Sequence, residues 1–257
     1  MKFLDNIELE SLALKLSRAS RRYAVEVCLE SYSCKMVTEE KRNFKELRAR
    51  LEEEGMQESS LKLGPSLTIR GMESLSGERP DSDKYVMSDY QAELDTNPRA
   101  QSRSRNPSLS SVGDHSGSAA KSGPTITAKE LFCLQVTLEQ AFNSYFLDTS
   151  SEDFALEPEL MMVKTYIAQF CSVYVDKYEQ HSSDLWTNIE QEIHPSRCII
   201  YSYKPDRSRE PYDTRYMSQF NYFFFNRSLK RVLFFSMIVR DSPPEDAYDE
   251  DEMEDIF

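Results

Sequence analysis

Glycine is scarce in this chain and confined to one stretch of it. All seven glycines lie between Gly55 and Gly123, so the residues before and after that stretch contain none. Loops that cradle phosphate need glycine, because a backbone without Cβ brings its N–H groups close to an anion. The sharp turn that exposes a hydrolase nucleophile depends on glycine as well. The glycine-free parts therefore argue against nucleotide-binding and hydrolase chemistry and favour a protein that acts by binding another.

Cysteine and histidine are few and far apart. The chain has five cysteines and three histidines, and the closest two cysteines, Cys28 and Cys34, are not spaced like the close pairs of zinc sites. Paired carboxylates such as Glu26 and Glu30 are not joined to any nucleophile, base or anion-binding loop. We therefore expect reduced, mostly buried thiols, no metal, nucleotide or other cofactor, and no enzymatic activity.

Long apolar runs are absent too. No stretch approaches the ~18 apolar residues of a membrane helix. The opening residues, MKFLDNIELESL, carry acids within their apolar stretch and show no cleavage pattern, unlike a secretory signal. The sequence predicts no membrane association and a location in the cytosol or nucleus.

Negative charge is what the chain has in excess. Its net charge is −13, and eight of the acids lie between Glu245 and Asp255. A nucleic-acid binder would carry the opposite sign, so we expect a basic partner. The acidic tail is either a solubilising extension or a mimic of nucleic acid that occupies a basic cleft. In the second interpretation the contact candidates are Glu245, Asp246, Asp249, Glu250, Asp251 and Glu252.

Residues 55–124 interrupt the chain. They hold every glycine, fifteen serines and only two aromatic residues. Such a segment buries too little apolar area to offset the entropy of ordering it, which predicts disorder. Residues 1–54 are too short and too charged to hold a core alone, which favours one interrupted domain over two linked ones. We expect a globular domain made of 1–54 and 125–241, a disordered insert over 55–124, and a disordered acidic tail over 242–257.

The residues before the insert predict a helix, a strand and a second helix. Leu9, Leu12 and Leu16 share one helical face, and the alternation from Tyr23 to Leu29 is typical of a half-buried strand. Thr38 is the expected N-cap of the next helix. An apolar stripe from Phe44 to Leu51 follows, and Gly55 ends that helix.

The residues after the insert predict helices first and strands afterwards. Thr127 and Glu130 have the spacing of a capping box that opens a leucine-rich helix. Apolar periodicity predicts further helices over 158–180 and 183–194. Aromatic and β-branched residues then predict strands over 197–203, 219–226 and 229–239, the last two forming a hairpin.

The strand over 219–226 is expected at the centre of the sheet. Tyr222 to Phe225 is apolar on both faces, so layers should cover it from both sides. Long aromatic strands left uncovered would aggregate, which is a further reason to expect helices over them. The predicted fold class is α+β, a single domain with a largely antiparallel sheet flanked by helices and interrupted by the insert.

The aromatic hairpin has a second interpretation. Exposed aromatic side chains on a sheet stack the bases of single-stranded RNA, and Arg227, Lys230 and Arg231 form a small basic cluster at the turn. The contiguous Phe223 to Phe225 leaves at most one face of the sheet open, so core packing is favoured. A single-stranded RNA-binding module remains the alternative function.

The insert contains a kinase-like motif. Arg103, Arg105 and Ser108 in RSRNPSLS form R-x-R-x-x-S, the spacing that basophilic kinases recognise. A phosphate there would add nearly two negative charges. Ser108 is the first phosphorylation candidate, and Ser104 and Ser110 are the others.

Three sequence blocks, in order, resemble one known family. They are ESYSCK (Glu30 to Lys35), IYSYKPD (Ile200 to Asp206) and FNYFFFNRSLKRVLFF (Phe220 to Phe235), with an acidic tail behind them. On these blocks the chain resembles the Maf-type negative regulators of RNA polymerase III transcription, which are unrelated to the leucine-zipper proteins of similar name. The block positions that we expect to be exposed or to confer specificity are Glu30, Lys35, Asp206, Asn221 and Lys230.

The resemblance carries a function with it. It implies a non-enzymatic global repressor that binds RNA polymerase III and hinders its recruitment by TFIIIB, whose TFIIB-related subunit it also contacts. It implies that protein kinases and phosphatases acting on the insert link repression to nutrients and stress. It further implies shuttling between nucleus and cytoplasm.

Overall fold

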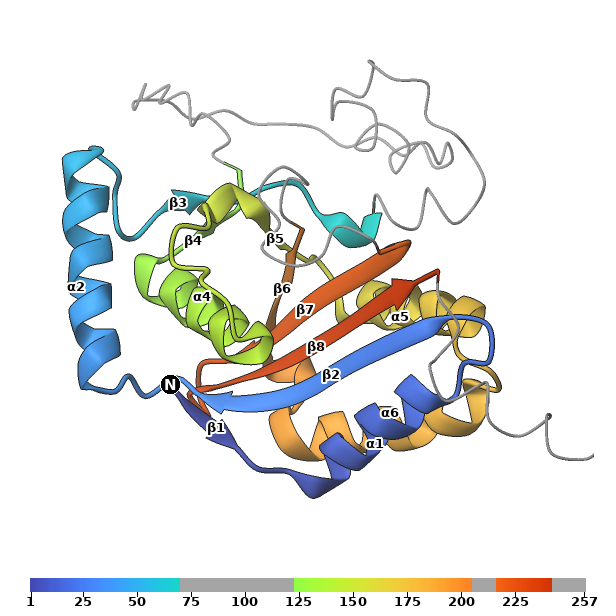
Figure 1. The fold of residues 1–257 in the computed structure, drawn as a ribbon. Helices are drawn as coiled ribbons and strands as arrows, with labels where there is room; N and C mark the ends of the chain where they lie inside the picture. Colours follow the sequence, from blue (N-terminus) through green and yellow to red (C-terminus); the bar gives the residue numbers. More distant parts are fainter. Residues whose placement is uncertain (70–122, 205–215, 242–257) are drawn as a thin grey trace, which may run out of the picture. The chain divides into compact units, whose positions relative to one another are not determined.

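A six-stranded sheet organises the chain. The structure, a computed structural model, describes residues 1–69, 123–204 and 216–241 (Figure 1). Before residue 70 the elements are β1 (Lys2–Leu4), α1 (Ile7–Arg18), β2 (Ala24–Ser33), α2 (Thr38–Glu53) and β3 (Leu61–Lys62). After residue 122 they are β4 (Thr125–Ile126), α4 (Ala128–Phe142), η1 (Ser151–Asp153), β5 (Phe154–Leu156), α5 (Leu160–Tyr174), α6 (Glu179–Ile193), η2 (Pro195–Arg197), β6 (Ile199–Tyr203), β7 (Ser218–Asn226) and β8 (Arg231–Arg240).

The sheet confirms the predicted fold class. Its strand order is β1-β2-β8-β7-β6-β5, and every neighbouring pair is antiparallel. β7 and β8 form the predicted hairpin and lie in the middle. Strand β2, which precedes the insert in sequence, pairs along its whole length with β8, which follows it. The two parts of the chain thus build one sheet flanked by helices.

The contiguous aromatics of β7 divide between the two faces of the sheet. Tyr222 and Phe224 point to one face, while Phe223 and Phe225 point to the other. All four are at most 6% exposed. Both faces of this strand are therefore covered, as the double-sided apolar pattern predicts.

Three helices cover the first face, which we call the three-helix face. Their apolar stripes supply the buried residues Leu9, Leu12 and Leu16 from α1, Val163, Ile167 and Phe170 from α5, and Leu185, Ile189 and Ile193 from α6. They pack on β7 and β8 side chains such as Phe235, which lies edge-on to Phe220 at 5.1 Å between ring centroids. The apolar cluster on this face is the larger of the two that the described residues form.

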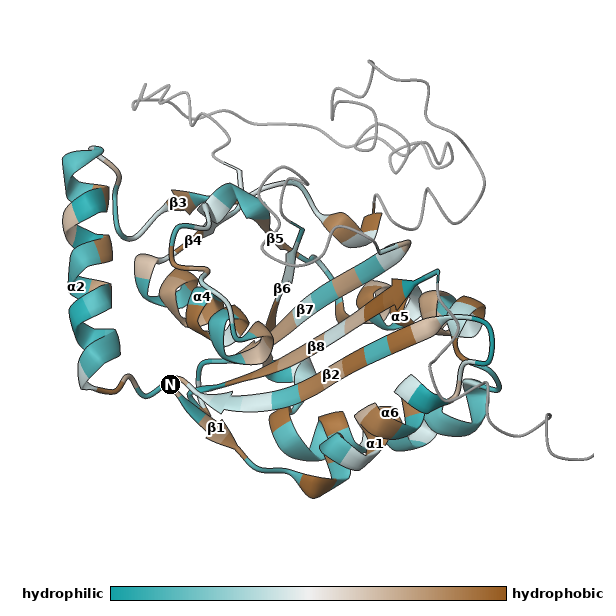
Figure 2. Ribbon diagram, viewed as in Figure 1, coloured by the Kyte–Doolittle hydropathy of each residue, from teal (hydrophilic) through white to brown (hydrophobic). Residues whose placement is uncertain are grey.

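The opposite face, which we call the α4 face, is built differently. Helix α4 is buried from Glu130 to Leu138, and the narrow stripe of α2 packs outside it. Figure 2 shows this contrast, because α4 is largely hydrophobic while most of α2 is hydrophilic. Leu47 and Leu51 are buried in the stripe and Phe44 is half-buried, as predicted.

Helix ends show where local signals succeed and fail. The capping box of Thr127 and Glu130 is confirmed: the Glu130 amide donates to the Thr127 hydroxyl at 3.2 Å, and the Glu130 carboxylate accepts from the Thr127 amide at 3.3 Å. Gly55, with φ +69°, follows the end of α2 as expected. The prediction of Thr38 as an N-cap is wrong: Thr38 is already helical, and the Glu40 carboxylate accepts from the Val37 amide at 2.8 Å.

The two helices after residue 158 are also displaced from their predicted bounds. The first ends at Tyr174 instead of reaching residue 180, and the second begins at Glu179 instead of 183. Val175 is extended and Lys177 has φ +56°. Without glycine or proline in this stretch, the local sequence carried no signal for the break.

The expected start of the disordered insert at residue 55 is too early. Residues up to Ile69 belong to the described fold: β3 pairs with β4, Leu61 and Thr68 are buried, and Gly64 forms a parallel bridge with Ala155. Gly64 donates its N–H to the Phe154 carbonyl at 2.8 Å, and a Cβ at this position would collide with the Glu152 carbonyl. The remainder of the proposed insert lies outside the described residues.

Candidate functional site

Two of the expected contact residues lie together at one end of the central strands. Lys35 and Lys230 are exposed, and the Cys34 amide donates to the Lys230 carbonyl at 2.8 Å. Glu30 lies on β2, the strand that precedes Lys35 in the chain. It is half-buried and accepts a hydrogen bond from the Tyr32 hydroxyl. Burial, reinforced by this carboxylate, raises the pKa of Tyr32 far above its usual range. Tyr32 is therefore a neutral hydrogen-bond donor at physiological pH.

The expectation that Asn221 is exposed is wrong. It is 2% exposed, donates to the Tyr203 carbonyl at 3.3 Å, and accepts from the Ser236 hydroxyl at 2.8 Å. These contacts join β6, β7 and β8 across the centre of the sheet. Asn221 is a satisfied polar group of the core, because a buried amide must find partners inside the protein.

The structure does not describe the other residues that we expected to be functional. The phosphorylation candidates, the loop aspartate and the acidic tail lie outside the described residues, namely Ser104, Ser108, Ser110, Asp206, Glu245, Asp246, Asp249, Glu250, Asp251 and Glu252.

The RNA-binding alternative is wrong. The central aromatic side chains that would stack bases are buried beneath helices on both faces. Two members of the basic cluster are also paired with acids, Arg227 with Glu130 at 2.5 Å and Arg231 with Glu192 at 3.1 Å. Neither a stacking platform nor a free basic stripe is available on this hairpin.

A buried carboxylate holds the segment that leads to residue 70, and sequence reasoning missed it. Glu157, 4% exposed, accepts hydrogen bonds from the Ser66 hydroxyl at 2.6 Å and from the Leu67 amide at 3.0 Å. The Thr68 amide is farther from it, at 3.4 Å, and the Ser202 hydroxyl donates to the same carboxylate. We call this assembly, Leu61–Thr68 with Glu157 and strand β4, the insert root.

A second contact ties the insert root to the centre of the sheet. The hydroxyls of Thr68 and Tyr222 are 2.9 Å apart, and both residues are at most 1% exposed. Burial raises the pKa of Tyr222 well above its ordinary value and that of neighbouring Tyr166 to about 12. Both phenols are neutral at pH 7. The only hint in the sequence was that Glu157, unlike Glu159 two residues later, directly follows the apolar run Phe154–Leu156.

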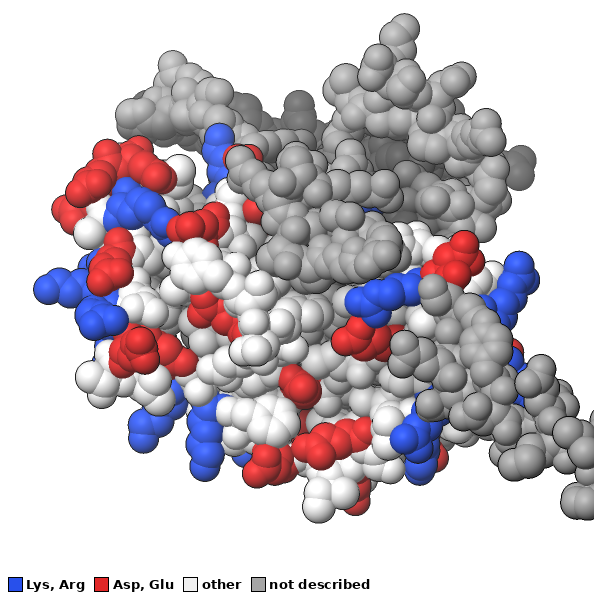
Figure 3. Space-filling model, in the orientation of Figure 1, with Lys and Arg blue, Asp and Glu red and all other residues white. Residues whose placement is uncertain are grey.

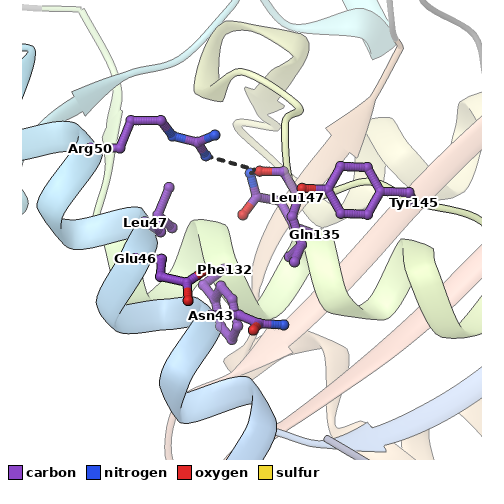
Figure 4. Close-up of a pocket in the computed structure, with 8 residues that line it drawn as sticks. All are labelled: Asn43, Glu46, Leu47, Arg50, Phe132, Gln135, Tyr145 and Leu147. Carbon is purple, nitrogen blue, oxygen red and sulfur yellow. Dashed lines mark hydrogen bonds between the residues drawn. The ribbon is translucent and has the colours of Figure 1, made fainter.

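A pocket of about 190 Å³ lies between α2 and α4 (Figure 4). It is lined by Asn43, Glu46, Leu47, Arg50, Phe132, Gln135, Tyr145 and Leu147. Arg50 reaches across it from α2, donating to the Leu147 carbonyl at 3.1 Å and pairing with Asp148 at 2.8 Å. Figure 3 shows acidic and basic side chains interleaved in the region of α2, so the surroundings of the pocket carry both signs.

Neither metal binding nor membrane insertion finds support in the described residues. Within them, no group of three or more histidine, cysteine or acidic side chains is placed to hold a metal ion. Their helices are also too short or too polar to cross a bilayer.

Comparison with known proteins identifies similar chains. The family model described as Maf1 regulator matches residues 25–236. A Dictyostelium discoideum protein named "Repressor of RNA polymerase III transcription" is 34% identical over 51% of this chain and 45% of its own length. A Schizosaccharomyces pombe protein, "Repressor of RNA polymerase III transcription maf1", is 31% identical over 36% of this chain and 39% of its own length. The matched regions thus span less than half of each curated relative.

Among solved structures, a crystal structure of citrus MAF1 has a similar fold. The match covers 91% of this chain and 99% of the citrus chain, with a TM-score of 0.50 and 18% sequence identity. At that identity the likeness concerns the fold alone.

Proposed function

Because this chain belongs to the Maf1 regulator family, we propose that it represses transcription by RNA polymerase III through binding rather than catalysis. The observation that carries the proposal is the family match, which runs from β2 through β8 and so includes the central strands of the sheet. The names of the two curated relatives support the same function.

The proposed mechanism is that the bound repressor hinders recruitment of the polymerase by TFIIIB, contacting its TFIIB-related subunit. The charge of the chain supports this, because a protein of net charge −13 is attracted to the basic surfaces of an enzyme that handles nucleic acid. The described fold adds a rigid scaffold, with a sheet covered on both faces. The acidic tail then supplies long-range electrostatic attraction.

Phosphorylation of the segment that follows the insert root is the proposed control. The Leu63 amide donates to the Pro124 carbonyl at 3.0 Å, and β3 pairs with β4, so described residues that precede the segment lie beside described residues that follow it. Phosphate groups added between these points change the charge of the protein without altering the core. Kinases and phosphatases acting on Ser108 would then set the strength of repression and the balance between nucleus and cytoplasm.

Transcription of a tRNA gene in a nuclear extract tests the proposed function. Purified full-length protein at micromolar concentration should lower the tRNA transcript while leaving an RNA polymerase II template in the same extract unaffected. In a parallel pull-down, mass spectrometry should recover the large subunits of RNA polymerase III selectively. Unchanged transcription together with absent polymerase would refute the proposal.

Variants at Ser108 test the proposed control. Ser108→Ala should repress more persistently and remain nuclear, whereas Ser108→Glu should repress less. Identical repression and localisation of the two variants would remove Ser108 as the switch.

A further inference from the structure

One buried oxygen atom at the pocket between α2 and α4 lacks a hydrogen-bond donor within the described part of the chain. Gln135 is 1% exposed, and its side-chain oxygen finds no hydrogen-bond partner among the residues that the structure describes. Leaving a buried acceptor without a donor costs about 1–3 kcal/mol. A donor supplied from outside the described residues would remove that cost.

The orientation of this amide is fixed by its neighbours. The Gln135 nitrogen donates to the Thr149 carbonyl at 2.8 Å and to the Leu147 carbonyl at 3.3 Å. Rotating the amide by 180° would place its oxygen against these two acceptors, so the nitrogen must face them. The oxygen is then aimed toward the α2 side of the pocket, as Figure 4 shows.

The size of the pocket limits the ligand. Small-molecule and cofactor sites usually occupy roughly 300–1,000 Å³, and this pocket measures about 190 Å³. It therefore suits one side chain of a partner better than a free metabolite. Tyr145, which is 63% exposed, provides aromatic surface for the stem of such a side chain, and the buried Leu47 and Phe132 complete the apolar part of the lining.

The polar groups of the pocket select a cationic donor. Glu46, exposed on α2, adds a carboxylate to the Gln135 oxygen as a second acceptor. The cation that lines the pocket, Arg50, is already paired with Asp148 and bound to a carbonyl. Arginine carries five N–H donors, no acceptor, and a flat face that stacks on aromatic rings.

We propose that this pocket binds an arginine side chain of a protein partner. The guanidinium donates to the Gln135 oxygen inside the pocket and to the Glu46 carboxylate at its rim, while the methylene groups of the arginine pack on Tyr145. Assigning that partner to the polymerase machinery rests on the proposed function. The chemistry of the contact rests on the pocket alone.

A peptide titration tests the chemistry on the full-length chain. The probe is acetyl-Ala-Arg-Ala-amide, and the control peptide carries citrulline, the neutral isostere, in place of arginine. NMR should show saturable shifts of the Gln135 side-chain amide with the arginine peptide, and binding at least roughly fivefold weaker with citrulline, as for loss of a charge-assisted hydrogen bond. Equal binding of both peptides, or no shift with either, overturns the proposal and leaves the pocket to water.

The chain offers a matched pair of variants for this titration. Glu46 and Glu39 are both exposed on α2 and lie at the same distance, 3.9 Å, from Arg42, but only Glu46 lines the pocket. Glu46→Gln should weaken arginine-peptide binding by roughly 1.5-fold to fivefold, the range for an exposed ion pair. Glu39→Gln should leave it unchanged. Equal effects of the two variants would mean that the peptide senses only overall charge, against the proposal.

The same positions separate this inference from the proposed function. In a polymerase pull-down, Glu46→Arg should reduce recovery relative to Glu39→Arg, because it places a competing cation at the rim. If wild-type protein recovers polymerase and both variants do so equally, the pocket is not a polymerase contact and the assignment of the partner is overturned. If wild-type protein recovers no polymerase, the proposed function fails, and the peptide titration still decides the chemistry of the pocket.

Discussion

The centre of the sheet and the insert root are held together by different kinds of contact. The centre consists of apolar side chains from β7 and β8 packed against helices on both faces, with Phe234 and Phe235 fully buried. The insert root is held largely by polar contacts, and one carboxylate, Glu157, accepts hydrogen bonds from two other segments of the chain. Apolar packing is shared among many neighbours, whereas changing Glu157 alone removes several hydrogen bonds of the root at once. We therefore expect a substitution at Glu157 to act locally, on the root, and a truncation at the centre to act on the whole fold.

The largest expected effect is a truncation at the centre. Phe235→Ala removes a fully buried ring that contacts Phe220, and should lower the free energy of unfolding by about 3–5 kcal/mol. Urea unfolding followed by circular dichroism measures it. As a control, Val173→Ala on the same face alters a side chain that is 57% exposed and should change stability by less than about 0.5 kcal/mol.

A smaller and more local effect is expected at the insert root. Glu157→Ala leaves the Leu67 and Thr68 amides and the Ser202 hydroxyl without their acceptor, which should cost roughly 1–3 kcal/mol. Hydrogen exchange should accelerate over residues 61–69 far more than over 218–240. Glu157→Gln, which keeps one carbonyl acceptor, should do less. Uniform acceleration across both segments would contradict the separation of the two regions.

A substitution at the start of α4 should have a weaker effect still. Thr127→Ala removes the N-cap of α4, an interaction worth about 1 kcal/mol. Because α4 is buried over most of its length, the loss should appear as earlier fraying of its first turn and not as unfolding of the sheet. Amide exchange at Glu130, which donates to the Thr127 hydroxyl, reports it directly. Thr127→Ser, which keeps the hydroxyl, should behave like wild type.

Cysteine reactivity should distinguish the centre from the margin of the sheet with little change in stability. Burial raises the pKa of Cys171 to about 12, whereas a hydrogen bond from the Cys133 thiol lowers the pKa of Cys34. Only thiolates are alkylated, so iodoacetamide at pH 7 should label Cys34 first. Cys133→Ala should slow that labelling, as read by mass spectrometry of tryptic peptides. Labelling of Cys171 before Cys34 in the folded protein would contradict the assignment.

Most of the secondary structure was predictable because its signals are local. The apolar spacing of α1, the capping box before α4 and the double-sided aromatic pattern of β7 each depend on residues within a few positions of one another. The predictions failed where the residues near a position carry no signal for its structure. The helix break around Lys177 contains neither glycine nor proline. For Asn221, the neighbouring sequence does not tell whether the side chain is buried with protein partners or exposed to water.

The candidate sites were harder to predict than the fold. Glu157 and Gln135 were both missed, since each acquires meaning only from groups brought to it by folding. Ser66 and Glu157 are separated by 91 residues, and the pocket is assembled from two helices on either side of the insert. Conversely, the sequence suggested that the basic cluster at the hairpin turn was free to bind a partner. In the structure, two of its members are paired with Glu130 and Glu192.

By itself, the sequence determined the α+β class, the central aromatic hairpin and the membership of a regulator family, because hydrophobic periodicity and ordered motifs are written along the chain. Only the tertiary structure decided which polar groups are buried and what they bind. A hydrogen bond needs its partner within about 3 Å, and for Glu157, Asn221 and Gln135 those partners come from other segments of the chain or, as we propose for Gln135, from another protein.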